Sequence, residues 1–408
     1  MLKNRDIVIV GLQPWDLEIL SNRKHMAFEL AKYNRVLFVN SPLDRASAIR
    51  QKNDPLVRKR LRVLHGQDDE LVQVGDNIWN FYPQTVLEPV SQIRINCLFD
   101  LLNFSNNRKF AREINKAIQQ LNFSDIILFN DSDLLRGFYL KDLLHSELFV
   151  YYTRDNFLPL RRWQRQGHRL LPRILAQADL VVSNSHYLTA AAESYNANSF
   201  FVGQGCSLED FDASIDYPRP AIYNNIPQPI IGFMGAMRSS RLDESILLTI
   251  AKQRPNWSIV LLGPEDNDFT SSTLHKQKNV HFLGNIDSVL MPQYAAHFDV
   301  AIHPQKNNEI TVGNYPRKID EYLALGLPIV ATHTVAMDFF KELVYLVEVS
   351  DSFVPLIEQA LKEDSEELQY KRIALANQHT WLASANLLSN FIEETEQKMK
   401  KTQRTKGV

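Results

Sequence analysis

The sequence predicts an α/β protein built from two tandem, doubly wound domains. Short apolar runs rich in Val, Ile, Leu and Phe recur along the chain. Such unbroken runs are typical of parallel strands that are buried on both faces. Amphipathic segments of helical period separate the runs, and this alternation favours right-handed strand–helix–strand crossovers. The length of 408 residues also exceeds what one compact core usually holds.

The first half of the chain carries one series of apolar runs, which we interpret as strands. Amphipathic helices are expected at 23–33 and 108–121. The segment 71–83 has a Gly-Asp-Asn turn between two alternating stretches, so we expect a β-hairpin there. The first run is short and is soon interrupted by Gln, Pro, Trp and Asp, which favours a strand over a signal peptide. The runs are DIVIVG at 6–11, RVLFVN at 35–40, DIILFN at 125–130, LFVYY at 148–152, LVVSN at 180–184 and SFFVG at 199–203.

A second series of runs follows a proline-rich segment. Residues 212–229 contain four prolines in eighteen positions and show no hydrophobic period, so we interpret them as a linker. Helices are expected between the later runs, at 242–253, 287–298, 316–325 and 351–363. The runs themselves are IIGFMG at 230–235, SIVLLG at 258–263, VHFLG at 280–284, DVAIHP at 299–304, PIVAT at 328–332 and VYLVEV at 344–349.

These patterns divide the chain into four parts. An N-terminal domain is predicted at 1–211, the linker at 212–229 and a second domain at 230–375. The segment 376–408 has a helical pattern without a further strand. We expect it to pack back towards the N-terminal domain and to end in a basic tail. Ligands of open parallel sheets bind beyond the carboxyl ends of the strands, so we expect a cleft between the two domains.

Composition and charge exclude several classes of protein. The net charge is −2, so no bulk field attracts nucleic acid. The two cysteines, Cys97 and Cys206, cannot build a disulfide framework or a Cys-rich zinc module, and they suit a reducing, cytoplasmic compartment. No apolar run approaches the roughly 20 residues of a membrane-spanning helix. The basic tail QKMKKTQRTKGV has two interpretations: a solvated terminus, or a weak peripheral contact at the inner face of a membrane.

The segment VGNYPRKIDEYLALGLPIVAT, at 312–332, is the most informative motif. Pro316 suits the first position of a helix, where a missing N–H costs nothing. Gly326 suits the end of that helix, and Pro328 prevents its continuation. Lys318 and Glu321 stand three residues apart, so they lie near one face of the first two turns.

The start of this predicted helix has the features of an anion site. Free backbone N–H groups are expected near Asn314 and Tyr315, and the helix dipole favours negative charge there. A pyrophosphate would be bound by these groups and by Lys318. Glu321 has two acceptor oxygens that suit the paired hydroxyls of a ribose. The alternative is that Glu321 only forms an exposed ion pair with Arg317 or Lys318.

A second basic element follows the run IIGFMG, which ends at Gly235. Arg238 and Arg241 lie in the next loop, before a helix that Asp243 can cap. Two arginines at the carboxyl end of a strand can neutralise a diphosphate leaving group. The alternative is that both are solvated loop residues.

These residues carry a resemblance to a known family. The second domain resembles the donor-binding domain of GT-B glycosyltransferases of the retaining family 4 type (glycosyl transferases group 1), which act in bacterial polysaccharide synthesis. The matching strings are IIGFMGAM, LDESILLTIAKQRPNWSIVLLGPED, NVHFLGNID, LMPQYAAHFDVAIHPQKNNEIT and NYPRKIDEYLALGLPIVAT. In the first domain QPWD, NRKHMAFELAK, RVLFVNSP, YYTRDNF and ADLVVSNSHYL resemble the family less closely. The resemblance implies two Rossmann-like domains that face a cleft.

The resemblance also implies roles for single residues. Glu321 corresponds to the second acid of the family's Glu-x7-Glu signature and is expected to bind the donor ribose. Arg241 falls near the basic residue that contacts the donor diphosphate, and Arg238 matches less well. The first acid of the signature is replaced by Gly313, which leaves the transferred sugar open. Backbone and loop groups expected at the donor are those of Gly235, Leu283, Gly284, Asn314 and Tyr315.

The first domain offers weaker candidates. Asp155, in YYTRDNF, lies at a predicted strand end, and we expect it to face the cleft. Asn130 and Asp131 lie at another strand end. Asp131 and Asp133 also form a D-x-D pair, the pattern that binds a metal in sugar transferases of a different fold. The alternative, favoured for each of these positions taken alone, is a strand-end cap or a hydrogen-bonded turn residue.

The sequence therefore predicts an enzyme: a glycosyltransferase of the hexosyltransferase type, which uses a nucleotide-sugar donor and a hydroxyl acceptor. The resemblance implies retention at the anomeric carbon, and an acceptor that is a glycan or a lipid-linked glycan of a cell-surface polysaccharide. The catalytic candidates are Arg238, Arg241, Lys318 and Asp155, with no metal and no cofactor expected. The alternatives are a nucleotide-sugar 2-epimerase of the same fold, a metal-dependent D-x-D sugar transferase, and a sugar-binding module.

Overall fold

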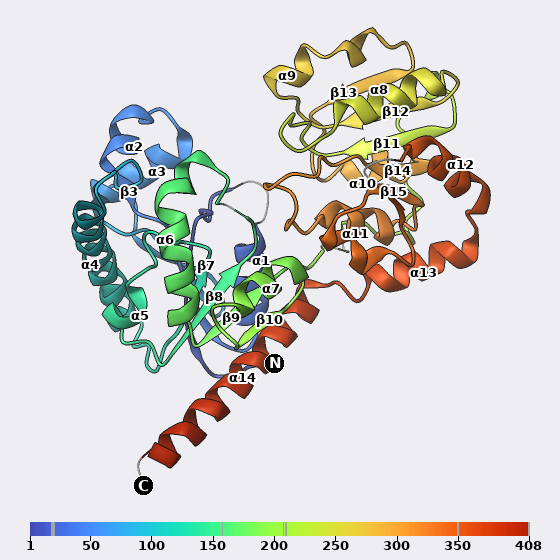
Figure 1. Ribbon diagram of the computed structural model, residues 1–408. Coiled ribbons are helices and arrows are strands. Elements are labelled where there is room, and N and C mark those ends of the chain that lie inside the picture. Colours follow the sequence, from blue (N-terminus) through green and yellow to red (C-terminus); the bar gives the residue numbers. More distant parts are fainter. Residues whose placement is uncertain (18–20, 157, 207, 209, 349–350, 407–408) are drawn as a thin grey trace. The chain divides into compact units, whose positions relative to one another are not determined.

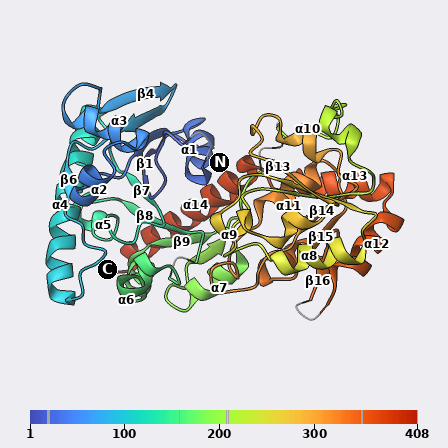
Figure 2. The same ribbon diagram turned by 90° about the horizontal axis from the view of Figure 1, so that it is seen from above.

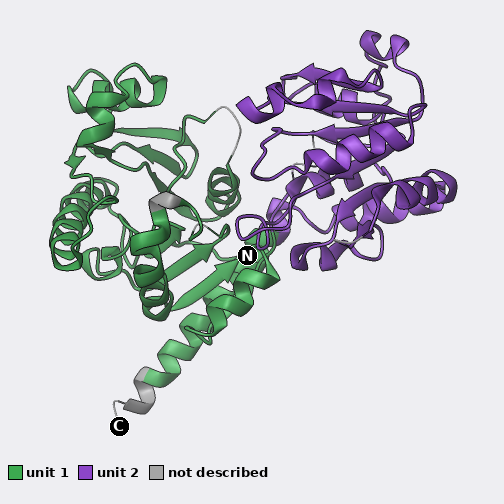
Figure 3. Ribbon diagram, turned by 45° about the horizontal axis from the view of Figure 1, so that its top comes forward, with its two compact units in different colours: residues 1–203, 384–408 green, residues 204–383 purple. Residues whose placement is uncertain are grey.

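The computed structural model describes residues 1–17, 21–156, 158–206, 208, 210–348 and 351–406 (Figure 1). The chain forms two compact units, coloured separately in Figure 3. Unit 1 comprises Met1–Gly203 together with Ser384–Val408, and unit 2 comprises Gln204–Ala383. The segment 212–229, which the sequence analysis assigns to a linker, thus lies within unit 2, and the last part of the chain belongs to unit 1.

Unit 1 is built around one sheet with the strand order β10-β9-β8-β7-β1-β2-β5-β4. All neighbours are parallel except β4 and β5, which form the hairpin that the sequence predicted. A separate parallel pair, β3 (Leu43–Asp44) with β6 (Val86–Leu87), was not predicted. The strands of the sheet are β1 (Asp6–Gly11), β2 (Arg35–Val39), β4 (Leu71–Gly75), β5 (Ile78–Phe81), β7 (Ile127–Asp131), β8 (Leu148–Thr153), β9 (Leu180–Ser183) and β10 (Ser199–Phe201).

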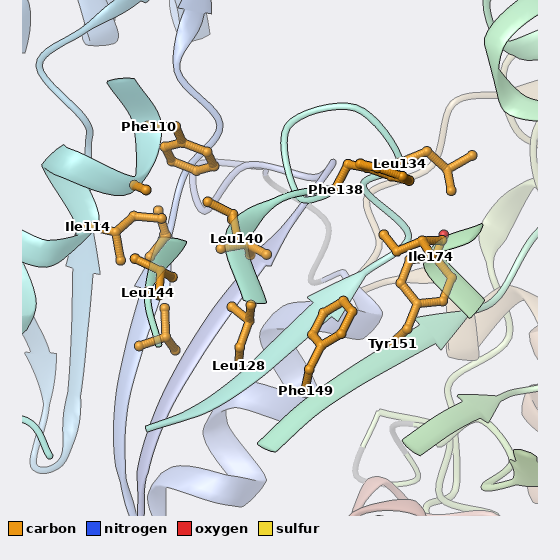
Figure 4. Packing of buried hydrophobic residues seen from close by; sticks show 14 of the residues in the cluster. Phe110, Ile114, Leu128, Leu134, Phe138, Leu140, Leu144, Phe149, Tyr151 and Ile174 are labelled. Atoms are coloured by element: carbon orange, nitrogen blue, oxygen red, sulfur yellow. The ribbon is translucent and has the colours of Figure 1, made fainter. Parts of the chain in front are cut away.

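Helices cover both faces of this sheet. On one face α4, α5 and α6 pack against the strands, and Figure 4 shows side chains of β7 and β8 meeting those of the helices. On the other face lie α1 and the first turns of α14 within unit 1, through Ala385, Leu388 and Ile392. The helices are α1 (Asn22–Ala31), α2 (Arg45–Arg50), α3 (Pro55–Leu64), α4 (Asn96–Gln120), α5 (Leu140–Leu143), α6 (Arg161–Gln177), α7 (His186–Glu193) and α14 (Trp381–Lys406).

Unit 2 contains a fully parallel sheet with the order β13-β12-β11-β14-β15-β16. Each strand coincides with an apolar run of the second predicted series. The reason is visible in β11, where Ile230 and Met234 enter one apolar cluster while Ile231 and Phe233 enter the other. The strands are β11 (Ile230–Met234), β12 (Ser258–Leu262), β13 (Val280–Gly284), β14 (Val300–His303), β15 (Ile329–Thr332) and β16 (Tyr345–Val347).

The helices of unit 2 are divided between the two faces of its sheet. Helices α8 and α12 cover one face, and α10, α11 and α13 cover the other (Figure 2). The α-helices are α8 (Glu244–Gln253), α9 (Asn267–Thr270), α10 (Met291–Ala295), α11 (Arg317–Ala324), α12 (Phe353–Glu363) and α13 (Glu366–Ala376). The 3₁₀ turns are η1 (Ala221–Asn225), η2 (Thr273–Lys276) and η3 (Val335–Phe340).

The order of the strands creates a switch point in unit 2. β11 and β14 are neighbours, but the chain leaves β11 towards α8 on one face and leaves β14 towards α11 on the other. Loops that diverge in this way open a crevice at the carboxyl ends of the two strands, and ligands of doubly wound sheets bind there.

Several helix boundaries differ from the prediction. Helix α4 begins at Asn96 rather than at residue 108. The sequence did not predict its early turns, because their apolar residues lie on more than one side and lack a clear period. Helix α10 is confined to Met291–Ala295, within the predicted 287–298. Pro316 caps α11 from outside, with φ −87° and ψ 77°, instead of occupying its first turn. Among the described helices, none is both long enough and apolar enough to cross a membrane.

Candidate functional site

Three neighbouring strands of unit 2 are followed or ended by glycines with positive φ. Gly235 follows β11 with φ 128°, Gly263 follows β12 with φ 133°, and Gly284 ends β13 with φ 71°. The Gly235 N–H donates to the carbonyl of Leu262 at 2.7 Å, and the Gly263 N–H donates to that of Gly284 at 2.7 Å. A Cβ on Gly263 would lie only 2.3 Å from the Gly235 oxygen. Glycine therefore permits both the backbone conformation and the close packing of these strand ends.

Lys318 lies against the first of these glycines. A Cβ on Gly235 would lie 2.8 Å from Lys318 Nζ, so the ammonium occupies the space that any other residue would fill. Nζ also lies 5.1 Å from the centroid of the Phe233 ring. The structure thus brings together Gly235 and Lys318, two candidates that stand far apart in the sequence.

The charged groups around the Lys318 ammonium do not offset the cost of burying its positive charge. Burial lowers the pKa of Lys318 to about 8. The Glu321 carboxylate opposes this shift, whereas the guanidinium groups of Arg317 and Arg241 add to it. A group whose pKa is lowered by burial and by like charges gains from a bound anion, because the anion restores the missing negative charge.

His303, at the end of β14, is a neighbour that the sequence analysis missed. Its side chain is buried, and burial, together with the nearby Lys318 ammonium, lowers its pKa to about 3. Nε2 lies 2.9 Å from Gln305 Oε1, an arrangement in which Nε2 donates and Nδ1 is left as an acceptor. Nδ1 is buried and has no hydrogen-bond partner in the described part of the chain. A histidine that directly follows an apolar run and precedes a proline was the available signal.

Helix α11 is fixed by contacts at both ends. The Tyr322 hydroxyl accepts from the Met234 N–H at 2.8 Å, which ties the helix to the end of β11. Asp320 is fully buried between the Tyr315 hydroxyl at 2.8 Å and His379 Nδ1 at 2.7 Å. Gly326, with φ 72°, ends the helix as the sequence predicted.

Glu321 lies on the same helix and is largely buried. Its Oε1 accepts from Arg317 Nε at 2.9 Å, in an i, i+4 pair whose side chains are 13% and 36% exposed. The pair matches the simple alternative that the sequence left open. Within the described residues this pair uses Glu321 Oε1 and not Oε2, so Glu321 remains a candidate for a second partner.

The start of α11 differs from the expected array of free N–H groups. The Asn314 N–H donates to the Thr311 carbonyl at 3.0 Å, and the Arg317 N–H donates to the Tyr315 carbonyl at 3.1 Å. The expectation was wrong for Asn314, because a turn from Asn308 to Thr311 precedes it and takes its N–H. The Asn314 side chain is instead the notable group: its Oδ1 is buried and lacks a partner among the described residues.

Arg238 and Arg241 lie in the loop between β11 and α8. The Arg238 carbonyl accepts from the Arg241 N–H at 2.8 Å, which forms a turn that carries both side chains. Both residues are exposed, and neither forms an ion pair within the described ranges. The Arg241 carbonyl also accepts from the Lys306 N–H at 2.8 Å, so this loop is joined to the loop that follows β14.

Leu283 and Gly284 lie at the carboxyl end of β13. Gly284 is exposed and Leu283 is half-buried, and nothing lies within 4 Å of the position of a Gly284 Cβ. This strand end is therefore accessible on the same edge of the sheet as Gly235. Within unit 2 all the predicted donor-site residues follow strand ends of one sheet edge or lie in α11 and its approach.

Asp155 belongs to unit 1, where it follows β8. It lies 3.6 Å from Arg154 Nη1, and Arg154 Nε donates to Asp131 Oδ1 at 2.6 Å. Arg154 Nη2 also donates to Gln13 Oε1 at 2.9 Å. Arg23 is fully buried nearby, and desolvation lowers its pKa to about 9 while Asp131 opposes that shift. The carboxyl ends of β1, β7 and β8 thus share a buried network of arginines and carboxylates.

Both aspartates of the D-x-D pair form ion pairs with arginines of unit 1. Asp133 Oδ1 accepts from the Arg136 N–H at 3.0 Å, and Oδ2 accepts from Arg136 Nε at 2.8 Å. Asp131 is paired with Arg154, while its Oδ2 has no partner in the described ranges. Both side chains are buried. This geometry favours the structural interpretation of the pair, and no grouping of three His, Cys, Asp or Glu residues suited to a metal occurs in the part of the chain that the structure describes.

Comparison with known proteins identifies the type of domain. Residues 228–363 match the family described as Glycosyl transferases group 1. A Bacillus subtilis (strain 168) protein, provisionally named teichuronic acid biosynthesis glycosyltransferase TuaH, is 29% identical over 171 residues. That match covers 40% of this chain and 42% of the relative. The resemblance to glycosyl transferases group 1 is therefore confirmed for residues 228–363.

Solved structures confirm the fold over nearly the whole chain. Anabaena HepE in complex with UDP has a TM-score of 0.66 at 14% identity, covering 96% of this chain and 100% of that one. The Escherichia coli trehalose-6-phosphate protein bound to UDP-2-fluoro glucose has a TM-score of 0.67 at 12% identity, covering 97% and 99%. The sucrose-phosphate synthase of Thermosynechococcus elongatus has a TM-score of 0.66 at 15% identity, covering 96% and 99%. The chain has the predicted GT-B fold.

The lowered pKa of Lys318 predicts a pH-dependent anion affinity. The ammonium is charged below its pKa of about 8 and loses its proton as the pH rises. Calorimetric titration with pyrophosphate should show affinity falling roughly tenfold between about pH 7.5 and 9, because one proton is linked to binding. Lys318→Met should weaken binding roughly tenfold at pH 7.5 and remove this loss.

The control variant is Lys252→Met, at an exposed position of α8. It should keep the wild-type profile. The titration of pyrophosphate itself is common to all three proteins, so the difference between wild type and Lys318→Met reports Lys318. If wild type and Lys318→Met show the same dependence on pH, Lys318 is not at the anion.

Proposed function

We propose that this chain is a glycosyltransferase that moves a hexosyl group from a nucleotide-sugar donor to a hydroxyl acceptor. The observation that carries the proposal is the undercompensated Lys318 ammonium, which packs on Gly235 at the switch point of unit 2. The match of residues 228–363 to the glycosyl transferases group 1 family supports the reaction class. The fold alone would not name a reaction.

The donor diphosphate is proposed to bind at the carboxyl ends of β11 and β14. Lys318 supplies a partly buried cation there, and Arg241 and Arg238 supply two exposed guanidinium groups from the adjoining loop. As the bond between sugar and diphosphate breaks, negative charge grows on the leaving oxygen. Preorganised cations at that oxygen stabilise the transition state more than the ground state, which is the requirement for catalysis.

The nucleoside is proposed to extend along the same edge. Glu321 accepts hydroxyl hydrogen bonds from the ribose, and the backbone near Leu283 and Gly284 contacts the base. Unpartnered buried acceptors at His303 and Asn314 are the groups that sugar hydroxyls can satisfy. UDP is the first nucleotide to test, because HepE and the E. coli structure were solved with UDP or a UDP-sugar.

The acceptor is proposed to be a glycan or a lipid-linked glycan of a cell-surface polysaccharide, as the name of the Bacillus subtilis relative suggests. In unit 1, Asp155 and the Asp131–Arg154 network line the strand ends where an acceptor would bind. A cytoplasmic location with peripheral contact to a membrane is part of this proposal.

Ribose binding by Glu321 can be separated from the Arg317 ion pair by comparing two variants. If Glu321 binds the ribose, Glu321→Ala should lower UDP affinity at least about tenfold, since hydrogen bonds to charged groups contribute about 1.5–3 kcal/mol each. Arg317→Met should change it less than roughly twofold, because the Arg317 side chain is 36% exposed and ion pairs at the surface contribute little. Calorimetry with UDP and, for comparison, other nucleoside diphosphates gives both values.

Glu366→Ala, at an exposed position of α13, is the matched control and should bind UDP like wild type. Circular dichroism verifies that each variant is folded. Equal losses in Glu321→Ala and Arg317→Met, or no loss in either, would show that Glu321 acts only as the partner of Arg317.

Metal independence is a further expectation of this site. Lys318, Arg241 and Arg238 are proposed to neutralise the diphosphate, and both aspartates of the D-x-D pair are committed to arginines. Donor hydrolysis or transfer should therefore persist in EDTA at more than about half of its rate with magnesium or manganese. Activity that EDTA abolishes and manganese restores would instead favour a metal-dependent transferase that uses the D-x-D pair.

The stereochemistry of transfer tests the assignment to a retaining mechanism. The resemblance to family 4 enzymes leads us to expect a product with the same anomeric configuration as the donor sugar. The one-bond and vicinal couplings of the anomeric proton in an NMR spectrum of the product identify that configuration. An inverted linkage would overturn the mechanism while leaving the donor site untouched.

A further inference from the structure

Helix α4 of unit 1 exposes a row of large apolar side chains. Leu98, Leu101 and Phe104 are 43%, 67% and 40% exposed, and Ile95, which caps the helix, is 61% exposed. The opposite side of the helix is buried in the core through Phe99 and other residues. Within unit 1 the helix lies at the periphery, next to α5 (Figures 1 and 2). Contiguous exposed apolar residues of this kind mark an interaction surface.

The same face becomes basic towards the end of the helix. Arg108, Arg112 and Lys116 follow at steps of four residues, so they continue the row beyond Phe104. The Arg108 guanidinium lies 6.0 Å from the Phe104 ring centroid. Arg112 and Lys116 line a groove of about 320 Å³ between α4 and Leu143 of α5.

Of the three basic residues in this row, Lys116 is paired with an acidic residue of α4, whereas Arg108 and Arg112 are not. Asp100 is bound by Arg169 from α6 at 2.7 Å, and Glu113 is buried and bound by Lys116 at 2.8 Å. Arg108 and Arg112 form no ion pair within the described residues. The exposed face of α4 therefore joins an apolar half to a half with uncompensated positive charge.

We propose that this face of α4 binds the surface of an anionic lipid bilayer. Leu98, Leu101 and Phe104 would enter the boundary between headgroups and acyl chains, and Arg108 and Arg112 would contact lipid phosphates. An interfacial helix requires an apolar stripe together with basic residues on the same surface, and the attraction to anionic lipid adds to apolar burial. The proposal deepens the peripheral membrane contact of the proposed function, on which it rests, by assigning that contact to one helix, and it holds for any acceptor.

Charge favours lipid over a second copy of the chain as the occupant. In a parallel pairing of two α4 helices, Arg108 would face Arg108. In an antiparallel pairing centred on Leu101, Arg108 would lie near Arg94 of the other copy. Both arrangements bring like charges together and cost free energy, whereas an anionic bilayer compensates them.

Vesicle sedimentation of the full chain tests the proposal. Wild type should sediment with phosphatidylglycerol–phosphatidylcholine vesicles and much less with phosphatidylcholine alone. The variants L98S/L101S and R108E/R112E should each weaken partitioning at least about tenfold, the first by removing apolar burial and the second by reversing the attraction. Salt should release the wild type from the anionic vesicles.

The control K400E/K401E makes the same change of charge in the basic C-terminal segment and should bind like wild type. Loss of binding in this control, with R108E/R112E unaffected, would assign the lipid contact to the tail instead. Pyrophosphate affinity and circular dichroism should be unchanged in all variants, since none of the altered residues lies in the proposed donor site.

Cys97 allows the contact to be located directly. It is exposed beside Leu98, whereas Cys206 is buried and burial raises the pKa of its thiol. A polarity-sensitive fluorophore on Cys97 should shift to shorter wavelength when anionic vesicles are added. An unchanged spectrum with bound vesicles would overturn the proposal. A concentration-dependent dimer that L98S/L101S abolishes, without vesicle binding, would assign this face to a second copy.

Discussion

The contact between the Lys318 ammonium and Gly235 is the constraint on which the candidate site depends. It requires a residue without a Cβ at the end of β11 and a helix that begins directly opposite. The Met234 N–H to Tyr322 hydroxyl bond and the burial of Asp320 between Tyr315 and His379 fix that helix. A cation positioned by backbone and buried contacts does not need to reorganise when an anion arrives, which is the property that makes electrostatic stabilisation effective.

Much of this arrangement could be predicted from the sequence, because the responsible signals are local. The central strands of the parallel sheets are buried on both faces, so their apolar runs are continuous and easily identified. The spacing of Lys318 and Glu321 places both on α11, and Gly326 marks its end. The family resemblance added the roles, which the spacing alone left open between a ribose ligand and an ion pair.

Other features depend on contacts that one sequence does not display. The Asp131–Arg154 pair forms because β7 and β8 are neighbours in the sheet, although the two residues are 23 positions apart. His303 becomes notable only through its burial near Lys318. The early part of α4 was missed because Leu98, Leu101 and Phe104 face solvent, which hides the helical period that core burial would impose. The features that the sequence analysis missed thus depend on burial or on contacts between residues far apart in the sequence.

The charged groups around Lys318, together with its burial, explain why its pKa is lowered. The Glu321 carboxylate acts to raise the pKa of Lys318, but it also pairs with Arg317. Arg317 and Arg241 act to lower the pKa of Lys318. Burial outweighs the effect of Glu321, so the pKa of Lys318 is lowered to about 8. A donor diphosphate would supply negative charge beside this ammonium, which is consistent with a site completed by its ligand.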